Sequence, residues 1–324
     1  MSDLYGRIIG TGSYLPERIV TNAELEKTVD TTDEWIVARS GIKQRAIAAE
    51  GEFTSDLAYQ AAAEAIKSSG INKSDIDLII VATTTPDLVF PSTATIVQTK
   101  LGLGGCAAFD VQAVCAGFVY GLDIVDKYIR SNSCKNALII GAETFSRIID
   151  WTDRTTCVLF GDGAGAMIVR ADNVPGIFSS SIYADGAFKE LLWVPSGVST
   201  ALSELEMGRA FTKMKGNEVF RWAVNTMSNI AAKTLRDNDM DASQLDWVVP
   251  HQANIRIIRA IAKKLSLPME KMVVTVAEHG NTSAASIPLA FDYAQRDGRL
   301  KSGDIILLEG FGGGFTWGSV LLKY

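Results

Sequence analysis

Residues 109–118 read FDVQAVCAGF, and this stretch decides the fold class. The apolar run Ala108–Val111 predicts a buried strand just before a turn of small residues. Apolar side chains then recur with spacings of four, three and four residues from Phe118 to Ile129, as on one face of a helix. A strand that passes directly into a helix is typical of α/β architecture, and it places Cys115 at the junction.

The same alternation continues along the chain. The expected strands are Leu78–Thr83, Ala108–Val111, Ala137–Ile140, Ala166–Val169, Trp247–Val249 and Ile305–Leu308. Between them lie amphipathic segments such as Leu57–Ser68. Unbroken apolar runs predict strands that are buried on both faces, so we expect sheets covered by helices.

Parts of the two halves of the chain resemble each other. Ser74–Ile80 reads SDIDLII and Ser243–Val249 reads SQLDWVV, and each half also has an apolar run followed by a glycine-rich turn and a second run. A chance likeness between two buried strands is the alternative. Duplication predicts one half over residues 1–172 and another over 173–324, divided at the turn-rich segment Asp172–Gly176.

Composition limits the classes of function. The 324 residues are 47% hydrophobic, and 31 basic against 37 acidic residues give a net charge of −6, so nucleic acid is not an expected partner. No apolar run is long enough to span a membrane, and Met1–Tyr5 does not resemble an export signal, which together predict a cytoplasmic protein. Four cysteines without a C-x-x-C pair and two histidines predict no metal site.

Cys115 is the first candidate for chemistry. At the start of a helix, unpaired backbone N–H groups and the helix dipole favour a thiolate, which can attack a thioester. A buried structural cysteine is the alternative, and it is the interpretation for Cys106, Cys134 and Cys157.

Two histidines and a glycine-rich loop supply candidate partners. His251 follows the strand Trp247–Val249, and His279 precedes a loop that holds Asn281, so either histidine is a candidate. Asn281 is either a cap or a donor to a developing oxyanion. The glycines of Gly310–Phe315 permit close backbone approach, or simply form a hairpin turn. Gly10-Thr11-Gly12 lacks the third glycine of a dinucleotide fingerprint, which is therefore rejected.

Basic residues line one face of the helix predicted after His251. They are Arg256, Arg259 and Lys263, with Lys264 beside them. A solvated face is the ordinary interpretation, and docking of an acidic partner that delivers a substrate is the functional one.

Taken together, several motifs resemble the β-ketoacyl-acyl carrier protein synthase III family. They are the Cys115 segment, His251–Asn254 (HQAN), His279–Ser286 (HGNTSAAS), Gly312–Gly318 (GGGFTWG), Thr32–Ile36 (TDEWI) and Asp153–Thr156 (DRTT). Their order and spacing match from end to end. The resemblance implies a duplicated thiolase-like α/β fold of five layers with two central mixed sheets, assembled as a homodimer, and no cofactor beyond a coenzyme A thioester substrate.

The resemblance also implies roles for single residues. Cys115 would accept the acyl group of acetyl-CoA or another short acyl-CoA. His251 and Asn281 would bind the thioester carbonyl of malonyl-acyl carrier protein, whose decarboxylation yields the attacking carbanion. The backbone N–H groups of Cys115 and Gly313 would form a second oxyanion hole. The product would be a 3-oxoacyl-acyl carrier protein that starts fatty-acid synthesis.

Further positions match binding surfaces of the family. Those matched to coenzyme A are Trp35 and Arg154, which flank the adenine, and Asn254 and Gly216, which contact the pantetheine arm. Those matched to the acidic carrier protein are Arg221, Arg256, Lys263 and Lys264. Phe90 would limit the acyl pocket, and Phe311 would lie beside the malonyl site.

Two other functions are compatible with parts of the pattern. One is an acyltransferase of secondary metabolism that uses coenzyme A thioesters directly, and the other is a non-catalytic acyl-CoA-binding protein. The joint presence of Cys115, His251 and Asn281 argues against the second. Val114 stands where many family members carry a small residue, so the preferred starter acyl group stays open.

Overall fold

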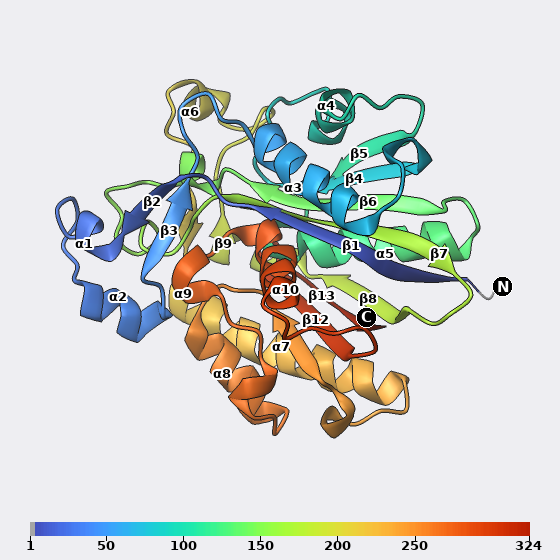
Figure 1. Ribbon diagram of the computed structural model, residues 1–324. Helices are drawn as coiled ribbons and strands as arrows, with labels where there is room; N and C mark the ends of the chain where they lie inside the picture. The colour runs from blue at the N-terminus through green and yellow to red at the C-terminus, as the bar shows by residue number, and fades with distance from the viewer. Residues whose placement is uncertain (1–3) are drawn as a thin grey trace.

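The structure is a computed structural model that describes residues 4–324. Two mixed β-sheets form the centre of the molecule (Figure 1). The first sheet has the strand order β1-β7-β6-β4-β5 and the second has the order β11-β12-β13-β8. Their strands are β1 (Tyr5–Tyr14), β4 (Leu78–Ala82), β5 (Ala107–Val111), β6 (Asn136–Glu143), β7 (Gly163–Asp172), β8 (Ile177–Ala184), β11 (Trp247–Pro250), β12 (Ile305–Gly312) and β13 (Thr316–Lys323). Two short two-stranded antiparallel sheets pair β2 (Arg18–Thr21) with β3 (Gln44–Ile47) and β9 (Leu192–Trp193) with β10 (Lys213–Met214).

Helices cover both sheets and separate them, which gives five layers (Figure 1). The outer face of the first sheet carries α3 (Thr54–Ser69) and α4 (Thr93–Lys100), and the outer face of the second carries α7 (Gly216–Asp237) and α8 (Ile255–Lys264). The central layer holds α5 (Gly117–Arg130) and α10 (Ser286–Arg296). The remaining short helices are α1 (Asn22–Leu25), α2 (Asp33–Ser40), α6 (Leu202–Glu206) and α9 (Val276–His279).

Alternating side chains of the central strands fill different cores. On β4, Ile79 and Val81 pack with α3 and α4, whereas Leu78 and Ile80 pack with the central helices. Since successive side chains of a strand point to opposite faces, both faces of such a strand need apolar residues. This explains why most of the six predicted strands, all found in the structure, are unbroken apolar runs, whereas the edge strand β5 includes Asp110.

The two sheets share one order of pairing. In the first, β4 is parallel to β6, which is antiparallel to β7, which is antiparallel to β1. In the second, β11, β12, β13 and β8 follow the same sequence of parallel, antiparallel and antiparallel pairs. The order supports the proposed repeat of residues 1–172 and 173–324, which places the division between the end of β7 and the start of β8.

Strand β1 was not predicted, and its glycines explain both its shape and the motif Gly10-Thr11-Gly12. A Cβ atom on Gly10 would lie 2.5 Å from the carbonyl oxygen of Ala65, and one on Gly12 would lie 2.3 Å from that of Ala61, both on α3. The glycines therefore let a helix pack directly onto the strand. Among residues 4–324, no helix is both long and apolar enough to cross a membrane.

Candidate active site

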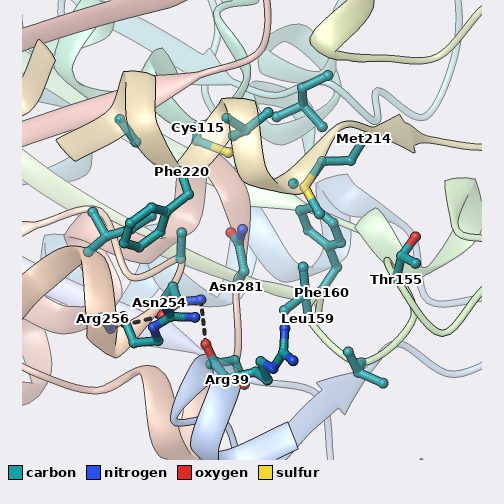
Figure 2. A pocket seen from close by; sticks show the side chains of 18 of the residues that line it. Arg39, Cys115, Thr155, Leu159, Phe160, Met214, Phe220, Asn254, Arg256 and Asn281 are labelled. Atoms are coloured by element: carbon teal, nitrogen blue, oxygen red, sulfur yellow. Dashed lines mark hydrogen bonds between the residues drawn. The ribbon is translucent and has the colours of Figure 1, made fainter. Parts of the chain in front are cut away.

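A pocket of about 400 Å³ brings Cys115, His251, Asn281 and Phe311 together. In Figure 2, Cys115 lies at one end, Asn281 and Phe160 lie further along, and Arg39, Asn254 and Arg256 lie at the other end. Cys115 is only 2% exposed whereas Arg39 and Arg256 are exposed, so the cysteine is at the deep end and the arginines are at the mouth. The pocket therefore joins segments from both halves of the chain.

Cys115 lies in the 3₁₀ turn Val114–Ala116 that leads into α5. Val114 has a φ of 47°, a left-handed conformation that is costly for a β-branched residue. Burial raises the pKa of the Cys115 thiol to about 12. The thiol is therefore protonated in the folded protein, and desolvation of the sulfur opposes the thiolate that the helix start was expected to favour.

His251 is a neutral hydrogen-bond donor. Burial lowers its pKa to about 3, so the ring carries no charge near neutral pH. Its Nδ1 lies 2.6 Å from Ser286 Oγ, and that oxygen accepts the backbone N–H of Gln252 at 3.3 Å. Among the contacts of the described residues, Nδ1 is the acceptor that the Ser286 hydrogen can reach, which assigns the ring proton of His251 to Nε2.

The Asn281 side chain is oriented by its neighbour. Its Oδ1 accepts the backbone N–H of Ser283 at 2.9 Å, and its own backbone N–H donates to Leu159 at 2.9 Å. With the oxygen engaged, the amide nitrogen is left as a donor in the pocket. His251 and Asn281 thus offer two uncharged N–H donors, a combination that suits a developing oxyanion.

The glycine loop between β12 and β13 is packed against the Cys115 turn. A Cβ atom on Gly312 would lie 2.6 Å from the backbone nitrogen of Cys115, and Thr316 Oγ1 donates to the carbonyl oxygen of Ala113 at 2.8 Å. A simple hairpin does not require such close approach. The next residue, Gly313, follows directly in this loop, and a Cβ atom there would lie 3.6 Å from the side chain of Val114 in the Cys115 turn.

Arginines surround Trp35 at the pocket mouth. The guanidinium carbons of Arg39 and Arg154 lie 5.3 and 5.4 Å from the ring centre of Trp35, and Arg154 also donates to the backbone oxygen of Asp30 at 2.6 Å. A ring stacked between Trp35 and Arg154 needs about 7 Å. Arg154 therefore has to swing aside before an adenine can enter between them.

The predicted pantetheine residues line the pocket. Asn254 caps α8 by accepting the backbone N–H of Arg256 at 2.8 Å, and it donates to the Arg39 backbone oxygen at 2.9 Å, as Figure 2 shows. Gly216 begins α7, and a Cβ atom there would contact only Met214. Arg39, which sequence reasoning missed, lines the same end of the pocket.

The two predicted phenylalanines differ in position. Phe311 lines the pocket and packs against Phe315, with ring centres 4.8 Å apart. Phe90 does not line the pocket of its own chain and is 83% exposed. Within one chain, Phe90 therefore does not reach the pocket that holds Cys115.

The four residues matched to the carrier protein lie on adjacent helices. Arg221 is on α7, and Arg256, Lys263 and Lys264 are on α8, all of them exposed. Lys264 Nζ donates to Asn225 Oδ1 on α7 at 2.8 Å, which ties the two helices together. Because Arg256 also lines the pocket, this basic surface is continuous with the mouth.

His279 does not reach the site. It is buried in contact with the edge of Tyr293, and burial lowers its pKa to about 4. It is absent from the residues that line the pocket. The choice between the two histidines therefore falls on His251.

Two residues that sequence reasoning missed adjoin the thiol. Cys115 Sγ lies 3.6 Å from Ser283 Oγ, which donates to Glu143 Oε1 at 3.0 Å. Glu143 is fully buried at the end of β6. An acidic residue that ends an otherwise apolar run was the signal in the sequence.

Comparison with known proteins identifies the family. Residues 109–186 match the model of 3-oxoacyl-[acyl-carrier-protein] synthase III, and residues 235–324 match that of its C-terminal region. The β-ketoacyl-[acyl-carrier-protein] synthase III of Thioalkalivibrio sulfidiphilus is 61% identical over 99% of both chains.

Solved structures agree with this similarity. The 3-oxoacyl-[acyl-carrier-protein] synthase III of Aquifex aeolicus superposes with a TM-score of 0.93 at 47% identity, over 98% of this chain and all of the other. A priming β-ketosynthase of the R1128 polyketide pathway has the same TM-score, 0.93, at 35% identity, over 98% of this chain and 96% of the other. The chain therefore belongs to the β-ketoacyl-[acyl-carrier-protein] synthase III family, thiolase-fold acyltransferases that catalyse the initiating condensation of fatty-acid biosynthesis.

Proposed function

We propose that Cys115 carries the acyl group in a two-step condensation of acetyl-CoA, or a similar short acyl-CoA, with malonyl-acyl carrier protein. The observation that carries the proposal is the meeting of a buried thiol with two uncharged donors, His251 and Asn281, in one pocket. In the first step the sulfur attacks the thioester carbonyl and coenzyme A leaves. The N–H groups of Cys115 and Gly313 stabilise the tetrahedral oxyanion.

The second step uses the other pair of donors. The malonyl thioester oxygen lies between His251 Nε2 and the Asn281 amide, and loss of carbon dioxide leaves an enolate whose charge these donors stabilise. A cationic residue is not required, and a carboxylate there would oppose the step. The enolate carbon attacks the acyl group on Cys115, and the thiolate leaves.

The pocket mouth and the basic surface deliver the two substrates. Trp35 and Arg154 would bind the adenine once Arg154 has moved, and Asn254 and Gly216 would contact the pantetheine arm. Arg221, Arg256, Lys263 and Lys264 would receive the acidic carrier protein. The proposed site of action is the cytoplasm.

The surface that one chain leaves uncovered supports a homodimer. Strand β5 is an edge of the first sheet, and Leu88, Val89 and Phe90 nearby are 51%, 76% and 83% exposed. An uncovered edge and exposed apolar side chains are features that a second copy would bury. We propose that Phe90 limits an acyl pocket across this interface, in the other copy.

Acylation and decarboxylation can be measured separately. Cys115→Ala should abolish uptake of radiolabelled acetyl groups from acetyl-CoA. His251→Ala and Asn281→Ala should still be acylated but should lose malonyl decarboxylation by about 100-fold or more. Peptide mapping by mass spectrometry locates the label, and acetylation of the Cys115→Ala protein at an unchanged rate would exclude Cys115 as the nucleophile.

A further inference from the structure

The Cys115 thiol adjoins a buried hydrogen-bond chain that ends on a carboxylate. Ser283 Oγ lies 3.6 Å from the sulfur and donates to Glu143 Oε1 at 3.0 Å. The second oxygen, Oε2, accepts from Thr85 Oγ1 at 2.7 Å, from the Thr84 backbone at 3.1 Å and from Thr83 Oγ1 at 3.4 Å. These donors hold the carboxylate in place, with Oε1 directed at Ser283.

The thiol needs a base that His251 does not supply. Attack by Cys115 on a thioester requires its proton to leave, because the thiol is protonated in the folded protein. His251 has a pKa lowered to about 3 by burial, and its Nδ1 already accepts the Ser286 hydroxyl. Glu143 is a stronger base, since burial raises its pKa to about 7.

We propose that Ser283 and Glu143 form a proton relay that takes the Cys115 proton during acylation and returns it after condensation. This rests on the proposed role of Cys115 as the nucleophile. As the S–C bond forms, the thiol proton passes to Ser283 Oγ, and the Ser283 proton passes to Glu143 Oε1. Coenzyme A leaves as a thiolate and takes a proton from solvent. When condensation releases the Cys115 thiolate, the relay runs in reverse.

The proton count over a full cycle is consistent with this scheme. Decarboxylation converts a malonyl carboxylate into carbon dioxide and a carbanion, which forms the new C–C bond and expels the sulfur. Glu143 returns the proton it stored, so its net change is zero. The single proton consumed is the one that the departing coenzyme A takes from solvent, which balances the lost carboxylate charge.

The surroundings of Glu143 suit a proton store. The groups that face it are hydroxyls and amides, from Thr83, Thr84 and Thr85 after β4 and from Ser283 and Ala284 before α10. Among residues 4–324, the titratable group that faces it is the Cys115 thiol. Its proton affinity is therefore set by desolvation and hydrogen bonds, with no cation to hold it ionised.

Backbone strain at Ser283 is a second, independent observation. Ser283 has a φ of 49°, a left-handed conformation that a non-glycine residue adopts at a cost. Glycine would fit this backbone better. The serine at this strained position instead places its hydroxyl 3.6 Å from the thiol sulfur.

Single-turnover acylation tests the relay. Wild-type protein is mixed with radiolabelled acetyl-CoA between about pH 5 and 9, a range of about two units on either side of the Glu143 pKa, and the rate constant for labelling the Cys115 peptide is measured. It should rise with pH through an ionisation near 7, because a protonated Glu143 cannot accept a proton. Glu143→Gln should lower it about 100-fold and remove this ionisation.

Variants at Ser283 separate the hydroxyl from the backbone. Ser283→Ala and Ser283→Gly should both slow acylation as much as Glu143→Gln does, although glycine relieves the strain. The control is Thr282→Val, which removes a buried hydroxyl without a partner from the adjacent residue and should keep the wild-type profile. The burst amplitude counts competent sites, so partial unfolding lowers the amplitude and leaves the rate constant interpretable.

The outcomes distinguish the relay from the nucleophile. Wild-type rate constants and pH dependence in Glu143→Gln and Ser283→Gly would overturn the relay while the label still lies on Cys115. Label on another residue would instead overturn the proposed function. Slow acylation in Ser283→Ala but not in Ser283→Gly would mean that Ser283 matters only for the backbone, which also rejects the relay.

Discussion

At the residue scale, hydrogen bonds determine which atom of each catalytic side chain faces substrate. Ser286 fixes the tautomer of His251, and the Ser283 backbone fixes the amide of Asn281. Burial then keeps His251 neutral. The two donors are therefore prepared before substrate binds, which avoids reorganisation during decarboxylation.

Ser286→Ala should slow malonyl decarboxylation about tenfold and leave acylation unchanged, because His251 loses the hydroxyl that holds its proton on Nε2. Because the pKa of His251 is lowered to about 3, the imidazole does not titrate above about pH 5, and decarboxylation should show no ionisation near 6.5. Carbon dioxide release from malonyl-acyl carrier protein measures the step. Ser228→Ala is the control, since its hydroxyl bonds only within α7. Equal slowing of acylation would contradict this assignment.

At the element scale, most of the strands predicted from the sequence are buried on both faces, and the edge strand β5 is the exception. Strand β4 is an unbroken apolar run, whereas β8 carries three serines and is half-buried at a sheet edge, and β1 is interrupted by glycines needed for α3. The pattern of apolar residues along a strand depends on its burial, so a half-buried edge strand such as β8 is hard to recognise from the sequence.

The candidate site, too, could be predicted from the sequence only in part. Cys115, His251 and Asn281 were predictable because each lies in a distinctive local motif at an element boundary. The contact between Cys115, Ser283 and Glu143 was not, because it joins three distant segments through tertiary packing. The outward position of Phe90 also depends on packing that local sequence does not encode.

The basic residues of helix α8 predict that binding of the carrier protein depends on charge. Lys263→Glu combined with Lys264→Glu should raise the KM for malonyl-acyl carrier protein about tenfold, because an acidic partner is repelled, and should change acetyl-CoA acylation little. Steady-state kinetics at low and moderate salt measure the effect, which should shrink as salt increases. Lys301→Glu, an exposed change of the same sign before β12, is the control. Equal KM values would exclude α8 as the docking surface and favour a free coenzyme A thioester as the extender.

At the scale of the whole molecule, the uncovered edge of the first sheet predicts association. The protein should have the mass of a dimer in light scattering, and Val89→Asp with Phe90→Asp should shift it toward the monomer, because charges would be buried at the interface. Val174→Asp, in the exposed turn after β7, is the control. A monomeric wild-type protein at micromolar concentration would contradict the proposal.

The shared strand order of the two sheets has a consequence in the central layer. Both α5 and α10 begin with a 3₁₀ turn, Val114–Ala116 and Ser283–Ala285, and the first residue of each turn is left-handed, with φ values of 47° and 49°. Under the proposed duplication, these turns are two copies of one ancestral corner that now touch each other. One copy holds the thiol and the other presents a hydroxyl to it, so a symmetric ancestor would have become asymmetric at the point where the chemistry takes place.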